Sequence, residues 1–210
     1  MNNSFVNTAR LLGAGLRALL VLTVLTGVLY PLAVTGVAQA FFRDKANGSE
    51  TRADGRVAGS SLIGQQGYGL RYFQPRPANG LGTNSVNTRY KLILSGATNL
   101  SADSKVLLKQ VEDARAEVVK DNSVPGYTVR PADVPADAVT SSGSGLDPDI
   151  SPQYAELQAH RVAERNGLPV ARVEQLVRDH TTGRTLGFLG EPRVNVLELN
   201  IALKDLVAKK

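Results

Sequence analysis

Residues 18–42 read Ala-Leu-Leu-Val-Leu-Thr-Val-Leu-Thr-Gly-Val-Leu-Tyr-Pro-Leu-Ala-Val-Thr-Gly-Val-Ala-Gln-Ala-Phe-Phe, a run without a single charged side chain. A helix of about 20 apolar residues crosses the hydrocarbon core of a bilayer. Only a helix or a closed barrel satisfies its backbone amides there. The run therefore predicts a transmembrane helix, which divides the chain into a short leader (1–17), the span (18–42) and one domain (43–210).

The charges beside the run bear on its orientation. Arg10 and Arg17 precede it without any acidic residue, whereas Arg43, Asp44 and Lys45 follow it. Orientation depends on Lys and Arg rather than on net charge, and the two ends are nearly tied. The free amino terminus and the acid-free leader favour an N-terminus inside the cell. We therefore expect a single-pass protein of the cytoplasmic membrane whose C-terminal domain lies outside.

A cleavable signal peptide is the alternative interpretation of the same run. The residues at 38–40, Ala-Gln-Ala, resemble a small-residue cleavage site. However, the apolar region of a signal peptide spans roughly 7–15 residues, and this run is considerably longer. The length favours a retained anchor, and a mature protein that starts near Phe41 would contradict it.

Four residues inside the run are candidates for packing against a partner membrane helix. Thr23 and Gly27 are small, as is typical where two membrane helices approach closely. Pro31, which follows Tyr30, removes one helical hydrogen bond and tends to kink the helix, and neighbouring helices commonly compensate. Ordinary membrane-helix composition explains the same residues, so the sequence leaves both interpretations open.

The composition excludes several classes of protein. The chain has 210 residues and a net charge of +5, with no cysteine, no tryptophan and 5% aromatic residues. Without cysteine there is no thiol nucleophile, zinc ribbon or redox pair. So few aromatic residues argue against a stacking platform for sugars or single-stranded nucleic acid. The basic residues are spread along the chain, as on a solvated surface beside anionic lipid, and we expect no nucleic-acid partner.

The remainder of the chain alternates Gly/Pro-rich stretches with apolar residues at helical spacing. It predicts turns and short strands over 43–88 and a strand at 127–129. Four helices are expected: one capped by Ser101, one capped by Ser151 and ended at Gly167, one from about Val170, and one from about Asn195. Helices and strands follow one another without a βαβ rhythm. The predicted class is α+β.

No stretch carries a complete catalytic or metal-binding motif. There is no phosphate-binding Walker loop and no nucleophile elbow. Asp147 and Asp149 are too few for a calcium loop. His160 and His180 are expected on helices, where a lone histidine is usually a surface or core residue. The 141–145 loop, Ser-Ser-Gly-Ser-Gly, could cradle an anion, although a flexible connector is the better interpretation. The sequence thus indicates no catalytic residue and no metal ligand.

Motifs along nearly the whole chain carry a family resemblance. In order they are Tyr-Pro at 30–31, Ala-Asn-Gly-Ser at 46–49, Gly-Ser-Ser-Leu-Ile-Gly-Gln at 59–65, Tyr-Phe at 72–73 with Arg-Pro at 76–77, Ser-Gly-Ala-Thr-Asn-Leu at 95–100, Val-Thr-Ser-Ser-Gly-Ser-Gly-Leu-Asp at 139–147, Gln158 with Arg-Val-Ala at 161–163, and Gly-Glu-Pro-Arg-Val-Asn-Val-Leu-Glu-Leu-Asn at 190–200. Together they closely resemble the C subunit of the bacterial Kdp potassium-transporting P-type ATPases.

The resemblance implies a small non-catalytic subunit of an inner-membrane potassium-uptake complex. Its partners would be a potassium-translocating subunit, a P-type ATPase subunit and a very small membrane peptide. The subunit is needed for assembly, and its outer domain would lie over the extracellular entrance of the translocating subunit. The sequence agrees by omission, since it lacks the Asp-Lys-Thr-Gly phosphorylation motif and a complete potassium filter.

The resemblance also implies a catalytic chaperone that raises the ATP affinity of the ATPase subunit. Its nucleotide contact is attributed to a glutamine, which matches Gln158 here. The predicted topology places Gln158 outside the cell, where ATP is scarce. An amide on a helix surface or in helix packing is therefore the better interpretation of Gln158, and we expect no tightly bound cofactor.

Two other functions compete with the accessory subunit. A free-standing membrane-anchored binding module of the cell envelope would behave as a stable monomer in detergent. A membrane-tethered hydrolase would need a nucleophile and base that the sequence does not reveal. The order of the motifs favours the accessory subunit over both.

Overall fold

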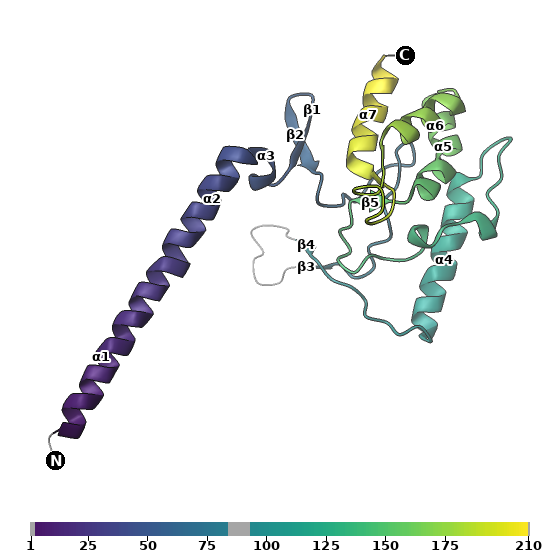
Figure 1. Ribbon diagram of the computed structural model, residues 1–210. Helices are drawn as coiled ribbons and strands as arrows, with labels where there is room; N and C mark the ends of the chain where they lie inside the picture. The colour runs from purple at the N-terminus through teal and green to yellow at the C-terminus, as the bar shows by residue number, and fades with distance from the viewer. Residues whose placement is uncertain (1–2, 84–92, 210) are drawn as a thin grey trace. The chain divides into compact units, whose positions relative to one another are not determined.

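The computed structural model describes residues 3–83 and 93–209. The chain forms two compact units, residues 1–49 and residues 50–210. A long apolar helix makes up most of the first unit, and helices mixed with short strands make up the second (Figure 1). The predicted class, α+β with a single apolar N-terminal helix of membrane-spanning length, is confirmed.

The helix of the first unit runs from Ser4 to Phe41 and is long and apolar enough to cross a membrane. Its parts are α1 (Asn3–Val24), the π-helical turn η1 (Leu25–Leu29) and α2 (Tyr30–Phe41), and the short α3 (Arg43–Ala46) follows. It begins well before residue 18, so most of the leader is helical, a feature the sequence analysis did not predict.

The π-helical turn lies directly before Pro31. The Tyr30 N–H donates to the carbonyl of Leu25, one residue further back than in an α-helix. A proline ring clashes with the carbonyl four residues before it, which here belongs to Gly27. A turn widened by one residue relieves such a clash. The distortion expected at Pro31 thus takes the form of a π-helical turn.

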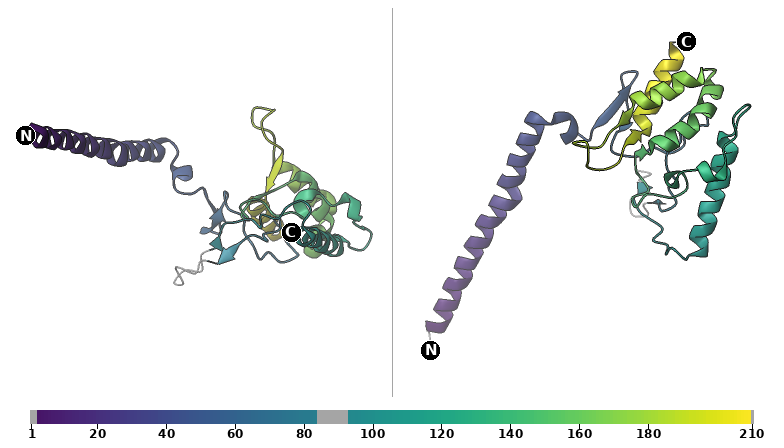
Figure 2. Two further views of the ribbon diagram at one scale, coloured as in Figure 1. Left: turned by 90° about the horizontal axis from the view of Figure 1, so that it is seen from below. Right: turned by 45° about the vertical axis from the view of Figure 1, so that its right-hand side comes forward.

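In the described part of the chain, the second unit combines helices with three small antiparallel sheets (Figures 1 and 2). Its helices are α4 (Lys105–Asn122), α5 (Pro152–Asn166), α6 (Val170–Asp179) and α7 (Val196–Ala208), with 3₁₀ turns η2 (Pro131–Asp133) and η3 (Ala136–Ala138). The hairpins pair β1 (Glu50–Ala53) with β2 (Arg56–Ser60), and β3 (Gly82–Thr83) with β4 (Ile93–Leu94). The third sheet has the order β5 (Asp149–Ile150), β7 (Arg193–Asn195), β6 (Thr181–Thr182).

The core of the second unit is built around α5. Eight of its fifteen residues are buried, so nearly the whole circumference of its central turns is covered, as expected for an interior helix. Apolar side chains from the neighbouring elements complete the core: Phe73, Val118, Val173, Val177, Val194, Leu199 and Leu203. Among them Val173 and Val177 lie one turn apart on α6, so one face of that helix is buried.

Local capping explains the limits of α5 and α7. The Ser151 hydroxyl accepts from the Tyr154 N–H at 3.0 Å, and Pro152 occupies the first turn. Gly167 ends α5 at φ +60°, a left-handed conformation that favours glycine. Asn195 caps α7 by accepting from the Glu198 N–H. Both predicted limits of α5 and the predicted start of α7 are confirmed.

Two local predictions are wrong. The cap of α4 is Ser104, whose hydroxyl accepts from the Leu107 N–H, while Ser101 donates to the Asp103 carboxylate instead. Residues 127–129 form no strand, since their pairing is limited to a tight bridge between Tyr127 and Val124. In both cases a residue close by in the sequence provides the partner, Asp103 for the Ser101 hydroxyl and Val124 for the backbone of Tyr127.

Candidate functional site

A cluster of four buried polar side chains lies at the centre of the second unit. These are Asn122 on α4, Gln158 and Arg161 on α5, and Asn200 on α7, each at most 4% exposed. Buried polar groups are costly unless they are hydrogen-bonded. The partners of this cluster therefore show what it does.

Arg161 makes four hydrogen bonds from the fully buried guanidinium. Its Nε donates to Asn122 Oδ1 at 2.8 Å and its Nη2 to Gln158 Oε1 at 2.7 Å. Its Nη1 donates to the carbonyls of Leu70 and Tyr72. None of these acceptors is a carboxylate, so every hydrogen bond to the buried charge comes from a neutral oxygen. The guanidinium joins α4 and α5 to the irregular segment 69–76.

Gln158 and Asn200 bind the backbone of the next two residues of the same segment, Phe73 and Gln74. Gln158 Oε1 accepts from the Gln74 N–H at 2.7 Å, and its Nε2 donates to the Gln74 carbonyl at 3.2 Å. Asn200 accepts from the Phe73 N–H at 2.8 Å and donates to its carbonyl at 2.9 Å. The two amides thus satisfy backbone groups that a neighbouring strand would satisfy in a sheet.

Burial controls the ionisation of two groups in this region. It lowers the pKa of Arg161 to about 10, although the nearby Tyr154 and Asp121 partly oppose the shift. It also raises the pKa of the Tyr154 hydroxyl to about 12. At neutral pH Arg161 therefore carries its positive charge and Tyr154 is uncharged. Neither group therefore changes its protonation state near pH 7.

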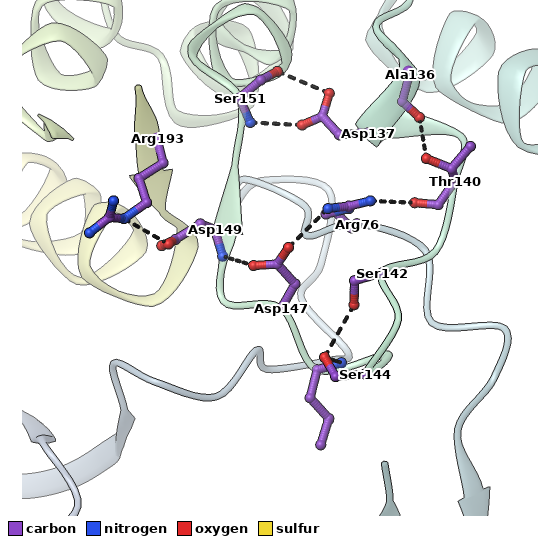
Figure 3. Close-up of polar contacts among 11 residues, drawn as sticks. Arg76, Ala136, Asp137, Thr140, Ser142, Ser144, Asp147, Asp149, Ser151 and Arg193 are labelled. Atoms are coloured by element: carbon purple, nitrogen blue, oxygen red, sulfur yellow. Dashed lines mark hydrogen bonds and ion pairs between the residues drawn. The ribbon is translucent and has the colours of Figure 1, made fainter. Parts of the chain in front are cut away.

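A second polar cluster connects the 69–76 segment to the three-stranded sheet (Figure 3). Arg76 pairs with Asp147 at 2.9 Å and reaches the carbonyl of Thr140. Asp147 also accepts from the Asp149 N–H at 3.0 Å, and Asp149 pairs with Arg193 at 3.0 Å. Burial raises the pKa of Asp149, against the opposing effect of Arg193. Asp147 and Asp149 thus serve as partners of two arginines.

The 141–145 loop is held in place, which corrects its interpretation as a flexible connector. The Ser144 carbonyl accepts from the Gly96 N–H at 3.0 Å and from the Ser95 hydroxyl at 2.9 Å. The N–H groups of Gly145 and Leu146 donate to Ser142 and Ser144 within the loop. These donors are therefore occupied, and the loop does not present them to an anion.

A close backbone contact beside this cluster gives a testable prediction. A methyl group on Gly64 would lie 2.5 Å from the carbonyl oxygen of Asp147, whereas one on Gly69 would meet nothing within 4 Å. Gly64→Ala should therefore lower the free energy of unfolding by about 1–3 kcal/mol through overpacking. Gly69→Ala, the matched control, should not destabilise the chain. Thermal unfolding of the full chain in mild detergent measures both, and equal melting temperatures would contradict the prediction.

A cavity of about 680 Å³ adjoins the buried cluster. Part of the 66–79 segment forms one wall and α4 the other, with Asp113, Glu117 and Asp121 spaced one turn apart along it. Arg161 also lines the cavity. In the described part of the chain, the buried Nε of Arg76, another lining residue, has no hydrogen-bond partner. The acidic wall favours polar or cationic groups over apolar ones.

The two histidines have structural partners. The His160 ring on α5 stacks on Tyr127, with 3.7 Å between ring centroids and 2° between ring planes. His180 ends α6, and its Nδ1 lies 2.9 Å from the Leu176 carbonyl. Within residues 3–83 and 93–209, no hydrogen bond joins either histidine to a serine or carboxylate, and no acidic and histidine side chains cluster closely enough to hold a metal ion.

The candidate residues from the sequence analysis belong to different units of the chain. Gln158 lies in the buried cluster, whereas Thr23, Gly27, Tyr30 and Pro31 belong to the long helix of the first unit. Sequence reasoning did not identify the cluster itself. A signal existed, because Gln158 and Arg161 fall at core positions of an otherwise apolar helix face.

Comparison with known proteins gives consistent matches along the chain. The family model described as "KdpC: K+-transporting ATPase, c chain" matches residues 12–205. A potassium-transporting ATPase KdpC subunit from Streptomyces coelicolor is 70% identical over 99% of this chain and 98% of its own length. Its counterpart from Mycobacterium tuberculosis is 49% identical, with 91% and 96% covered, and that from Kineococcus radiotolerans is 46% identical, with 98% of each covered.

Proposed function

The chain belongs to the KdpC family, the c chain of K⁺-transporting ATPases, and on this premise we propose that it is a non-catalytic accessory subunit that assembles and stabilises the ATP-driven potassium-uptake complex. The observation that carries the proposal is the family match over residues 12–205. The structure supports it, because the buried polar side chains and both histidines of the second unit are occupied in holding the fold. Translocation and ATP hydrolysis then belong to the partner chains.

We place the subunit in the inner membrane with residues 1–17 inside, residues 18–42 spanning the bilayer and residues 43–210 outside. A helix that is long and apolar enough to cross a membrane supports the span. Arg10 and Arg17 in an acid-free leader support the orientation. The intact mass of the membrane-extracted protein tests the anchor, since a chain beginning near Phe41 would overturn it.

We assign the membrane-partner contact to Thr23, Gly27, Tyr30 and Pro31. A methyl group on Gly27 would meet only the Thr23 methyl, at 3.9 Å, so the chain's own fold does not require glycine there. A small residue with no internal role suits close approach of another helix. The partners of the subunit are then the potassium-translocating subunit, the P-type ATPase subunit and the small membrane peptide, with lipid around them and no nucleic acid.

Purification of the C-terminally tagged full chain in mild detergent from potassium-starved cells tests the assignment. We expect larger membrane subunits and potassium-stimulated ATPase activity to accompany the chain. If the chain emerges alone and inactive, the accessory role is overturned and the free-standing anchored module takes its place.

A more specific role would be that the chain raises the ATP affinity of the ATPase subunit through a direct contact between Gln158 and the nucleotide. The geometry favours a packing role, because the Gln158 side chain is fully buried and both of its amide atoms bond to Gln74. ATP would reach this amide only after segment 69–76 was displaced. We therefore propose that any effect on ATP affinity passes through assembly rather than through Gln158.

Gln158→Ala should lower the free energy of unfolding by about 2–3 kcal/mol, because buried donors of Gln74 and Arg161 lose their acceptor. The apparent KM for ATP of complexes that still assemble should stay at the wild-type value. Gln153→Ala, an exposed glutamine on the same helix, is the matched control for both measurements. A raised KM without loss of thermal stability would instead establish nucleotide contact.

A further inference from the structure

Residues 183–190, which form most of the connection between β6 and β7, carry three large apolar side chains that the fold leaves exposed. Leu186 is 79% exposed, Phe188 69% and Leu189 51%. Figure 2 (left view) shows this loop projecting from the helices of the second unit. A concentration of apolar surface at one projecting point is typical of a contact site.

The shape of the loop is fixed by its backbone and not by these side chains. Two backbone hydrogen bonds join Thr185 and Leu189. The Thr185 N–H donates to the Leu189 carbonyl at 2.9 Å, and the Leu189 N–H donates to the Thr185 carbonyl at 3.0 Å. At the base of the loop Arg184 pairs with Glu191 at 2.9 Å. Little conformational entropy is therefore lost when the loop binds, which favours affinity.

The backbone conformation of Leu186 is not explained by packing within the fold. Its φ is +54°, in the left-handed region that glycine and asparagine adopt with least strain. A leucine in this conformation strains the backbone, and because its side chain is exposed, packing within the fold does not offset the strain. Contact with another molecule would give this side chain a function.

Charge distinguishes a protein partner from a lipid surface. Loops and helices that bind anionic lipid combine apolar residues with free Lys or Arg. Both cations of residues 181–195 are already neutralised, Arg184 by Glu191 and Arg193 by Asp149. An aromatic and two aliphatic side chains without free charge instead match the apolar centre of a protein interface.

We propose that the 183–190 loop inserts Leu186, Phe188 and Leu189 into an apolar pocket on the outer face of another protein subunit of the potassium-uptake complex. The inference rests on the accessory-subunit function proposed above, because that function supplies a protein partner on this side of the membrane. The loop then adds a second attachment point, in the outer domain, to the contact made by the membrane helix.

Photocrosslinking in native membranes tests the partner directly. The full chain carrying Phe188→p-benzoylphenylalanine should form a covalent product with a larger membrane protein on irradiation. The matched control is the same substitution at Leu108, which is 58% exposed on α4 and should give no such product. A product with phospholipid, the absence of any product at Phe188, or equal yields at both positions would overturn the assignment.

A second variant measures the contribution of the loop without disturbing its backbone. Leu186→Asn keeps a residue that tolerates φ above zero and removes the apolar side chain. We expect the variant chain to leave the detergent-solubilised complex about 30-fold faster than wild type, the scale of one interface hot spot, while Leu108→Asn leaves at the wild-type rate. Equal rates for Leu186→Asn and wild type overturn the loop proposal alone. If the wild-type chain carries no partner at all, the accessory function itself has failed.

Discussion

Replacing Arg161 with alanine should lower the free energy of unfolding of the chain by about 3–5 kcal/mol. Each buried polar group left without a partner costs about 1–3 kcal/mol, and the change leaves the carbonyl of Leu70 and the amide oxygen of Asn122 without the donor they have here. The Tyr72 carbonyl loses one of its two donors and keeps Gln74 Nε2. The lost side-chain volume adds a cavity cost.

Thermal unfolding of the full chain in mild detergent, followed by far-ultraviolet circular dichroism, measures this effect. At about 2–4 °C per kcal/mol for a domain of this size, the melting temperature should fall by roughly 6–20 °C. Arg165→Ala is the matched control, because Arg165 is exposed on the same helix one turn further on. A second variant, Arg161→Met, restores most of the volume without the donors. Wild-type stability of both Arg161 variants would show that the buried hydrogen bonds contribute nothing net.

Asn200→Leu is expected to have the second largest effect, a loss of about 2–4 kcal/mol in the free energy of unfolding. The leucine keeps the branched shape and the number of non-hydrogen atoms of the side chain, but the buried N–H and carbonyl of Phe73 lose their partners together. Because Phe73 itself is fully buried, water cannot replace the amide without opening the core.

The matched control for Asn200→Leu is Asp205→Leu, which places a leucine at an exposed position of the same helix and should leave the melting temperature nearly unchanged. Combining Asn200→Leu with Arg161→Met tests whether the two sites act together. Their side chains hold adjacent peptide groups of one segment, so the double loss should be smaller than the sum of the single losses. Strict additivity would show that Arg161 and Asn200 hold the segment independently.

Local signals along the chain predict most of the helix limits of the second unit. Ser151, Pro152 and Gly167 specify both ends of α5 through contacts within a few residues along the chain. Asn195 does the same for the start of α7. The cap of α4 failed because two serines stand three residues apart, and Ser101 is diverted to Asp103. A cap depends on where one hydroxyl points, which the residue pattern leaves open.

The candidate site was less accessible to sequence reasoning. The sequence leaves open whether the Gln158 amide lies on a helix surface or in helix packing, and its burial decides for packing. The sequence of residues 141–145 predicts a flexible connector, yet Ser95 and Gly96 hold its backbone, and Ser95 and Ser144 are 49 residues apart along the chain. Nothing within the loop itself predicts those contacts.

Composition and near neighbours along the chain account for the apolar helix, the α+β class, both limits of α5 and the start of α7. The order of the motifs along the whole chain indicates the family. What the buried polar side chains do, and which apolar side chains stay exposed, depends on the tertiary structure. Phe73 and Asn200 are 127 residues apart along the chain, and the exposure of Phe188 depends on the absence of a covering element. Such pairings follow from how the elements pack against one another, because a hydrogen bond or a buried face needs a partner in space rather than in sequence.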